Sequence, residues 1–419
     1  MNTPNFRIKI QLIIIALLAL SPFPALAKSD MISERQIIQA AMQSSPDIQG
    51  VLKDATNAKA DADQEGRLAN PTAKFDAIRT STPGDDSNSF DVEIEQPLKL
   101  SQLTGTRTML SNTLFEQADL REQHGMIQAI WNVRMLYADV WKLQEQERLY
   151  TEFKKRAEDV SAKINKAVKA GQTPISEGSL FQGDVAKFSS DLEQIKARQS
   201  QLRLQLEKST GLSLLGRKLE KPELDTITSD SAELEKAARA NASLVRLLET
   251  DLKAAERKKY AAIADSAGPE IAPRFIYSRN DDAEEDSVGV GVMLTIPLWN
   301  RNQSERQKAD AEKRFAQSQL DSFQQMPLGE RLSRILESIE RLDRQIDLLN
   351  DDALPNYRQS FKQAQRSFAA GQMNAAALWQ IRERLFETES QAIDAYLEAL
   401  DARRLLSLET GTLPQEVTQ

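Results

Sequence analysis

The sequence predicts a mainly helical chain that carries two short β-hairpins and is built from two copies of one unit. Two long stretches poor in proline indicate extended helices, and each is preceded by a pair of short alternating segments typical of strands. Duplication follows from residues that recur at a constant offset of 200 positions. The markers are Phe75 with Phe275, Pro97-Leu98 with Pro297-Leu298, Ala170-Gly171-Gln172 with Ala370-Gly371-Gln372, and Thr210-Gly211 with Thr410-Gly411.

The N-terminal segment has the features of a secretory signal peptide. Arg7 and Lys9 form a positive region, residues 10–20 are almost wholly apolar, and Ala25-Leu26-Ala27 is a cleavage pattern of small residues. The apolar run is too short to span a membrane as a helix. The predicted organisation is a signal peptide at 1–27, a first repeat at 28–214, a linker at 215–230, a second repeat at 231–412 and a tail at 413–419.

Composition excludes several classes of function. The formal net charge is −8, which argues against nucleic acid as a partner. The chain contains no Cys and a single His, so neither a disulfide framework nor a thiolate metal site is expected. No stretch after the signal peptide is apolar over a length that would span a membrane as a helix.

The helices are expected to be long and to pack lengthwise. Ser33 and Gln36 form a capping box before the first helix. The long helix of the first repeat is predicted at about 100–168, a length of roughly 100 Å at 1.5 Å per residue. Its counterpart at about 301–368 contains Pro327, Gly329 and Pro355, where kinks or breaks are expected. Apolar residues in both halves recur with a heptad period, which favours coiled-coil packing.

The strands are predicted at about 72–80, 90–97, 271–280 and 288–297. Alternation gives the second strand an apolar face and an acidic face, the latter formed by Asp91, Glu93 and Glu95. Strands of about nine residues with one apolar face match the length that crosses a bilayer. Four strands cannot close a barrel, so two chains would give eight strands and three would give twelve. The alternative is a small soluble four-stranded sheet beneath the helices.

Over essentially its whole length after the signal peptide, the sequence resembles the TolC family of outer-membrane factors. The resemblance rests on the duplicated order, on Pro97-Leu98 and Pro297-Leu298, and on the segments KAVKAGQTPISEGSLFQGD and RSFAAGQMNAAALWQIRERLFE. It implies a homotrimer in the outer membrane of a Gram-negative bacterium, with a twelve-stranded β-barrel continued by a long α-helical barrel in the periplasm. The two tips of that helical barrel are expected at Gly171 and Gly371.

The resemblance also implies a function and partners. Such channels passively conduct substrate from an inner-membrane pump of the RND type and a periplasmic adaptor to the exterior. The chain length and short tail look most like the branch that exports heavy-metal cations such as cobalt, nickel, zinc and cadmium. The alternatives are a duct for drug efflux or type I secretion, or a soluble periplasmic coiled-coil adaptor or scaffold.

No catalytic chemistry is expected. The sequence has no nucleophile elbow, P-loop or HExxH pattern, and its one His, His124, lies within the long helix. We therefore expect no enzyme activity, cofactor or metal site. Carboxylates are the candidate functional groups of the strands and their second loop, because acidic rings attract cations. They are Asp91, Glu93, Glu95, Asp281, Asp282, Glu284, Glu285 and Asp286. The alternative is that these are ordinary solvated surface residues.

Candidate adaptor contacts lie at the two tips. They are Gly171, Gln172, Thr173, Gly371, Gln372 and Met373, although the glycines are equally explained by the backbone geometry of a turn. Many members of the family carry Asp six and nine residues after the second tip glycine, whereas this chain has Ala377 and Gln380. The residues expected to close the tip instead are Glu177, Arg382, Glu383 and Arg384.

Overall fold

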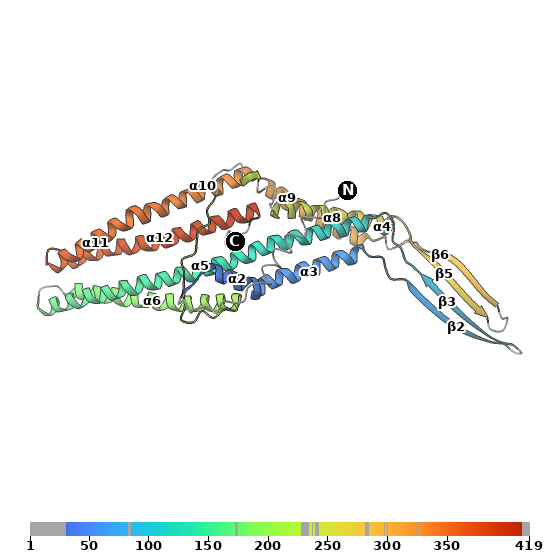
Figure 1. The fold of residues 1–419 in the computed structure, drawn as a ribbon, viewed down its shortest axis with the longest axis horizontal. Helices are drawn as coiled ribbons and strands as arrows, with labels where there is room; N and C mark the ends of the chain where they lie inside the picture. Colours follow the sequence, from blue (N-terminus) through green and yellow to red (C-terminus); the bar gives the residue numbers. More distant parts are fainter. Residues whose placement is uncertain are drawn as a thin grey trace.

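The computed structural model is an elongated molecule with a four-stranded sheet at one end and helices along its length (Figure 1). It describes residues 31–82, 85–171, 175–227, 234–236, 238, 243–280, 285–296, 298–299, 301–325 and 327–412. The predicted signal peptide and tail lie outside these residues. So do Gln172, Thr173, Asp281, Asp282 and Glu284.

The first repeat runs from two short helices through a hairpin into two long helices. Its elements are β1 (Met31–Ile32), α2 (Glu34–Ser44), α3 (Pro46–Gly66), β2 (Thr72–Thr82), β3 (Asp85–Glu95), α4 (Leu100–Leu103), α5 (Thr106–Lys169) and α6 (Ile175–Thr210). Strand β4 (Lys218–Leu219) follows and pairs in parallel with β1.

The second repeat has the same order with a more divided long helix. Its elements are α8 (Ser243–Ala267), β5 (Glu270–Asn280), β6 (Glu285–Thr295), α9 (Gln303–Gln324), α10 (Leu328–Asp347), the π-helix η1 (Leu348–Ala353), α11 (Leu354–Ala369) and α12 (Ala375–Thr410). The mainly helical character expected from the sequence is therefore confirmed, and both hairpins are present.

Local sequence explains where these helices begin, end and break. Ser33 and Gln36 make the reciprocal hydrogen bonds of a capping box at the start of α2. Gly105 adopts a left-handed conformation, with φ of 71°, and separates α4 from α5, where the sequence had predicted one helix from residue 100. Pro327 precedes α10, and Pro355 lies in the first turn of α11, directly after the π-helix. Proline has no N–H to donate, so the long helix is interrupted at both places.

The four long strands form one antiparallel sheet in the order β2-β3-β5-β6. The register places Phe75 opposite Val92, Ile94 opposite Phe275, and Phe275 opposite Val290 on one face. Residues of the opposite parity form the other face, which carries Asp91, Glu93 and Glu95 as the alternation predicted.

Each strand continues into a helix, and the helices keep the order of the strands. Helix α3 precedes β2, α5 follows β3, α8 precedes β5 and α9 follows β6. These four helices pack as a layer in which α3 contacts α5, α5 contacts α8, and α8 contacts α9. The layer and the sheet therefore have matching edges, formed by α3 with β2 and by α9 with β6.

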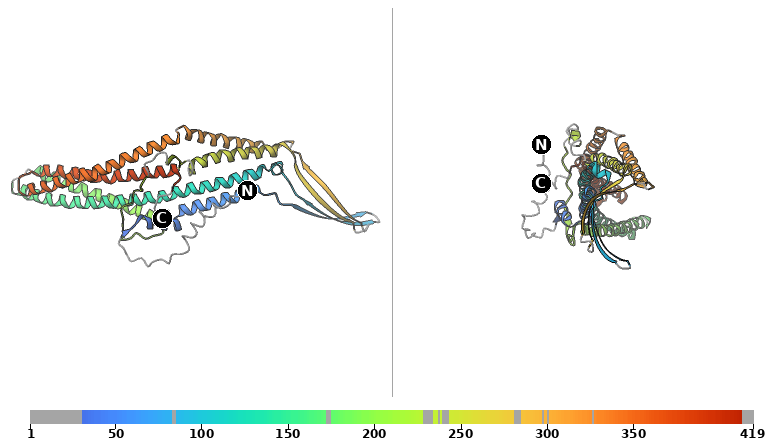
Figure 2. Two further views of the ribbon diagram at one scale, coloured as in Figure 1. Left: turned by 45° about the horizontal axis from the view of Figure 1, so that its top comes forward. Right: turned by 90° about the vertical axis from the view of Figure 1, so that its right-hand side faces the viewer.

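Ion pairs bridge neighbouring helices of this layer. Lys59 of α3 lies 2.6 Å from Glu122 of α5, and Lys253 of α8 lies 3.2 Å from Glu116 of α5. Away from the sheet, the hairpins α5/α6 and α11/α12 run side by side to the far end of the molecule (Figure 2). No helix in the described ranges is long and apolar enough to cross a membrane.

The main hydrophobic core lies midway along the molecule, where α5, α12 and the segment before the second repeat meet. Trp131, Tyr137 and Leu400 are buried there. Arg134 of α5 is fully buried among them and forms ion pairs with Glu34 of α2 and with Asp225. Its remaining terminal nitrogen donates to the carbonyl of Glu223 at 2.6 Å. One guanidinium therefore joins the N-terminal helix, the long helix and the connecting segment.

Further side chains hold the same connecting segment against the core. Tyr137 donates to the carbonyl of Glu220 at 2.7 Å, and Tyr396 of α12 donates to that of Pro222. Arg403 of α12 donates to the carbonyl of Asp225 at 3.0 Å and to both carboxylate oxygens of Asp343 at 2.9 Å. Residues 220–225, within the predicted linker, are therefore fixed by hydrogen bonds to helices of both repeats.

Replacing Arg134 with methionine should lower the free energy of unfolding by about 3–5 kcal/mol, because the buried carboxylate of Glu34 loses this counter-charge. Urea denaturation followed by circular dichroism measures the effect. Lys53→Met is the control, since Lys53 is exposed and its ion pair is with the adjacent, exposed Asp54, and it should change stability by less than about 0.5 kcal/mol. Equal midpoints for the two variants would contradict the role assigned to Arg134.

Candidate functional site

Acidic residues line the polar face of the sheet, but two of the three expected there have partners within the chain. Arg274 of β5 donates to Glu93 at 2.8 Å, and the hydroxyl of Ser278 donates to Asp91. Glu95 lies opposite Thr72 and Arg274 in the register. The face therefore has an excess of negative charge that Arg274 partly neutralises.

Arg274 is a functional candidate that the sequence reasoning missed. Its side chain lies over Gly291 of β6, where an added Cβ would come within 3.0 Å of its Nε. The absence of a side chain at Gly291 thus gives Arg274 the space from which it reaches Glu93. The sequence does place a basic residue at a polar-face position of β5. Its partner, Glu93, becomes evident only from the register of the strands.

The opposite face of the sheet is apolar and exposed. Val290 of β6 is 87% exposed, and Phe75 of β2 is 65% exposed. A soluble sheet normally buries such a face against another layer. The exposed large side chains on this face are Phe75, Phe90, Ile94, Phe275, Val288, Val290, Val292 and Leu294.

At the outer end of the sheet, Glu285 and Asp286 begin β6 and are both exposed. Asp286 accepts a hydrogen bond from the hydroxyl of Tyr277 at 3.0 Å. The other candidate acids of this loop lie outside the described residues.

The tip glycines end helices in equivalent ways. Gly171 follows α5 and Gly371 follows α11, with φ of 72° and 71°. A Cβ added to either would meet nothing within 4 Å, so what the two positions require is the left-handed backbone. Gln372 is exposed and its N–H donates to the carbonyl of Ser367 at 2.8 Å, while Met373 is half-buried against the apolar cluster of α11 and α12.

The candidate residues for closing the tip do not form one cluster. Arg382 is buried, whereas Glu383 and Arg384 are exposed on α12. The side chain of Glu177 lies outside the described part of the structure. Of these residues, Arg382 has the unusual environment.

Arg382 lies in an aromatic cluster that joins three helices. The cluster comprises Tyr150 and Phe153 of α5, Phe181 and Phe188 of α6, and Trp379 and Phe386 of α12, with ring centroids 4.6–6.3 Å apart. The guanidinium carbon lies 3.5 Å from the ring centroid of Phe153 and 4.8 Å from that of Trp379. Burial, together with the nearby positive charge of Arg156, lowers the pKa of Arg382 to about 9, so the group remains charged at neutral pH.

Metal-binding geometry is not found in the described residues. His124 is half-buried within α5, and burial lowers its pKa. In the same described ranges, no group of three or more His, Asp or Glu residues is arranged to hold a metal ion.

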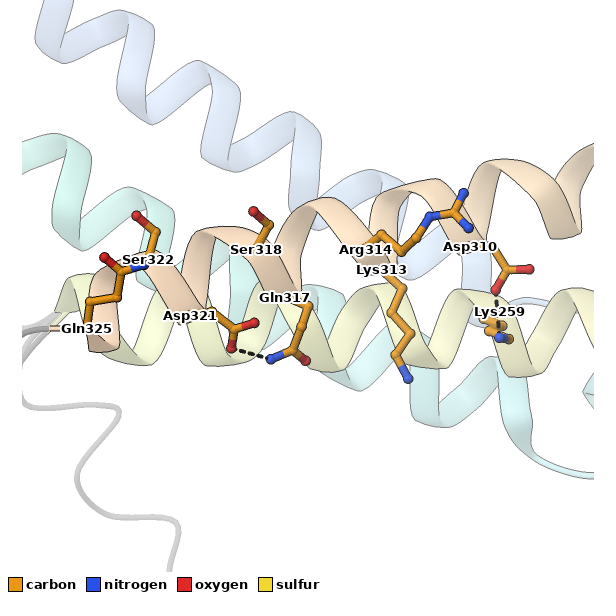
Figure 3. Close-up of a pocket in the computed structure, with 9 residues that line it drawn as sticks. All are labelled: Lys259, Asp310, Lys313, Arg314, Gln317, Ser318, Asp321, Ser322 and Gln325. Carbon is orange, nitrogen blue, oxygen red and sulfur yellow. Dashed lines mark hydrogen bonds and ion pairs between the residues drawn. The ribbon is translucent and has the colours of Figure 1, made fainter.

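A shallow polar groove of about 750 Å³ runs between α8 and α9, along one edge of the helical layer (Figure 3). Two of its cations are paired across the two helices, since Lys259 lies 2.6 Å from Asp310 and Lys313 lies 2.8 Å from Glu256. Arg314, which also lines the groove, is exposed and forms no ion pair with the described residues. This arrangement offers paired and free charges along an edge, not a site for a small substrate.

Two buried arginines of α12 should respond oppositely to replacement by methionine. Arg403→Met should lower the free energy of unfolding by about 1–3 kcal/mol, because backbone carbonyls and Asp343 lose their donor. Arg382→Met should leave it unchanged or raise it by up to about 4 kcal/mol, because it removes a buried charge that has no acidic partner. Denaturation of both variants under one condition measures the difference, and equal losses would contradict it.

Comparison with known proteins agrees with this architecture. Residues 236–412 match the family model described as outer membrane efflux protein. No curated protein is matched by the sequence. Among solved structures, the CmeC outer membrane channel of Campylobacter jejuni superposes with a TM-score of 0.74 at 13% identity, covering 91% of this chain and 86% of that chain.

Two further structures are similar. A membrane protein from Pseudomonas aeruginosa gives a TM-score of 0.73 at 18% identity, covering 91% of each chain. The MtrE outer membrane channel of Neisseria gonorrhoeae, solved in its open state, gives 0.68 at 16% identity, covering 90% of this chain and 89% of that chain. At these identities the likeness is one of fold. The second half of the chain is thus similar to the outer membrane efflux protein family, and the whole chain has the fold of solved outer-membrane channels.

Proposed function

We propose that three copies of this chain form an outer-membrane channel that passively conducts substrate from an inner-membrane RND-type pump and a periplasmic adaptor to the exterior. The exposed apolar face of the sheet carries this proposal, because lipid is the environment in which such a face is stable. The match of residues 236–412 to outer membrane efflux proteins supports it.

The edges of the sheet support assembly into a ring. Strands β2 and β6 lie at opposite edges, and backbone groups at an edge must be paired when the sheet lies in hydrocarbon. Pairing β6 of one copy with β2 of the next continues the antiparallel order and keeps the apolar faces on one side. Such a contact joins different surfaces of the two copies and therefore builds a closed ring or an open filament. The resemblance to TolC-family channels favours three copies and twelve strands.

The helical layer supports the same contact. Helix α3, at one edge of the layer, has Asp61 and Asp54 among its exposed residues, the latter paired with Lys53, whereas α9, at the other edge, has Arg306 and Arg314. The two helices run in opposite directions, and α3 ends beside the sheet where α9 begins (Figure 1). A ring would bring these opposite charges together at each junction between copies, which favours this pairing of edges.

The polar face of the sheet would then line the channel. Asp91, Glu93 and Glu95 outnumber Lys74 and Arg274 on this face, and the ring would repeat the excess charge in every copy. An acidic lumen favours cations. Divalent heavy-metal cations such as cobalt, nickel, zinc or cadmium are the favoured substrates, because the carboxylates of this face would attract cations.

The tips would contact the adaptor. Both tips expose the turn between two long helices, and an adaptor with its own helical hairpin fits such an end. We assign the contacts to Gly171, Gln172, Thr173, Gly371, Gln372 and Met373. Glu177, Arg382, Glu383 and Arg384 remain the candidates for holding the tip closed, with Arg382 favoured because it contacts the neighbouring hairpin.

Drug efflux and type I secretion are the rival functions within transport, and a soluble periplasmic adaptor is the rival outside it. Growth of a deletion strain across a panel of metals and drugs separates the transport functions. Membrane fractionation separates a channel from a soluble adaptor, since the channel should sediment with the outer membrane and require detergent for extraction.

Membrane insertion predicts that lysine is tolerated on one face of β6 and not on the other. Val290→Lys places a charge on the apolar face and should destabilise the inserted protein by about 2–4 kcal/mol if it lies near the bilayer midplane. Met293→Lys, on the polar face of the same strand, is the matched control and should insert normally. Recovery of folded trimer from outer membranes measures both. Equal recovery of the two variants would contradict the proposed insertion of this sheet in the membrane.

Charge reversal on the polar face should change ion selectivity. Replacing Asp91, Glu93 and Glu95 together with lysine should abolish or invert the cation preference, because the excess negative charge becomes positive. Arg274→Gln removes a positive charge from the same face and should strengthen that preference. Reversal potentials of single channels in asymmetric salt report both changes. Unchanged selectivity in the two variants would show that these residues do not line the conducting path.

A further inference from the structure

In the half of the molecule nearer the tips, no hydrogen bond or ion pair between described residues joins α5 to the hairpin α11/α12. The ion pair between Lys142 and Asp394, 2.7 Å apart, is the last one between α5 and α12 along that direction. Beyond it, no hydrogen bond or ion pair joins the described side chains of α5 to those of α11 or α12. Apolar and aromatic contacts make up this part of the interface. The two hairpins can therefore slide past each other here without breaking a hydrogen bond.

Cations stacked on aromatic rings recur along the same interface. Arg156 of α5 lies 5.3 Å from the ring centroid of Phe361 on α11, and Lys163 lies 5.8 Å from that of Phe368. From the first contact to the second, the cation on α5 and the ring on α11 are each seven residues further along the helix, or about two turns. An attraction between a cation and a ring face persists over a range of positions, unlike a hydrogen bond, whose geometry is narrow.

Arg382 is the buried member of this set. It is 3% exposed, and none of its three guanidinium nitrogens has a hydrogen-bond partner among the residues that the structure describes. The stack on Phe153 is its contact with the neighbouring hairpin. A buried cation without an acceptor is unfavourable unless the rings compensate it, so this position of Arg382 is poorly stabilised for a charged group.

Two carboxylates, Glu152 of α5 and Glu389 of α12, line a small cavity of about 20 Å³ beside Arg382. Glu389 lies on the same helix as Arg382 and accepts a hydrogen bond from Arg358 at 2.9 Å, so a shift of α12 along α5 moves Arg382 relative to Glu152 and not relative to Glu389. Glu152 is the neighbour of Phe153 on α5, and its partners, Arg156 at 3.3 Å and Arg148 at 3.6 Å, lie one turn away on the same helix. Exposed pairs of this kind contribute little to stability. Glu152 can therefore leave Arg148 and Arg156 and pair with Arg382 instead at little cost in stability.

We propose that Arg382 is a two-position latch between the helical hairpins, stacked on Phe153 in the arrangement seen here and paired with Glu152 after α12 shifts along α5. In the first position the cation has rings but no acceptor, and in the second it has an acceptor but loses the ring of the other hairpin. Two positions of comparable stability make the relative placement of the hairpins switchable. If the chain forms the proposed channel, this switch would set how far its tip opens.

Distances between spin labels test the latch directly. The chain contains no cysteine, so cysteines introduced at the exposed positions Lys155 of α5 and Glu387 of α12 are the only labelling sites. Labelled chains are mixed with an excess of unlabelled chains, so that each measured distance lies within one copy. Pulsed dipolar spectroscopy of the detergent-solubilised protein then gives the distribution of distances.

Separate variants disturb each of the two positions of Arg382. Phe153→Leu removes the ring and should create or enlarge a second population of distances. Glu152→Gln removes the negative charge of the acceptor and should abolish that population, both alone and combined with Phe153→Leu. Arg382→Lys keeps the charge without the flat stacking group and should act like Phe153→Leu. Lys362→Met, an exposed cation on α11, is the control and should match the unmodified protein.

One distribution shared by the unmodified protein, Phe153→Leu and Arg382→Lys would overturn the latch. So would a second population that survives Glu152→Gln. Conductance in planar bilayers is measured in parallel and tests whether the chain forms a channel. An unmodified protein that forms no pores would refute the proposed channel, while the label distances would still decide whether the latch exists.

Discussion

The buried guanidinium of Arg134 is the contact on which the arrangement of the two repeats depends. It joins α2, the middle of α5 and residues 223–225, and so fixes the connecting segment where the chain passes from one repeat to the other. Arg403 reaches the same segment from α12. Because helices of both repeats hold the segment, the repeats keep their relative position midway along the molecule. Towards the sheet, ion pairs such as that between Lys253 and Glu116 also join the repeats. Nearer the tips, apolar and aromatic contacts join them.

Buried arginines divide the molecule into a fixed and an adjustable part. Arg134 and Arg403 have carboxylate and carbonyl acceptors, which fix direction as well as distance. Arg382, on the same helix as Arg403, has aromatic rings and no hydrogen-bond acceptor within the described part of the chain. The difference follows the length of the molecule: directional bonds hold the centre, and non-directional contacts hold the interface between hairpins nearer the tips. In the proposed channel, this distribution would leave the body fixed and the end adjustable.

Features that depend on local backbone geometry could be predicted from sequence. The alternation around Asp91 and Glu93 gave the two faces of the hairpin, because side chains of a strand alternate regardless of its partners. The left-handed turns at Gly171 and Gly371 follow similarly from residue type. Contacts between the repeats could not be predicted. The partner of Glu93 is Arg274, and the ring beneath Arg382 belongs to Phe153, so each pair forms only once the repeats are folded together. A break near Pro355 was expected, but its form as a π-helix was not.

Strand order and helix order coincide, since β2, β3, β5 and β6 join α3, α5, α8 and α9 in the same sequence. Any closed assembly of this chain must therefore contain as many helices around its circumference as strands. Strands in a sheet are spaced about 4.8 Å apart, whereas packed helices are spaced 8–10 Å apart. Equal numbers of each would give circumferences that differ about twofold, and tilting of the strands would reduce the mismatch. The width of one section therefore cannot be changed by adding or removing a copy without resizing the other.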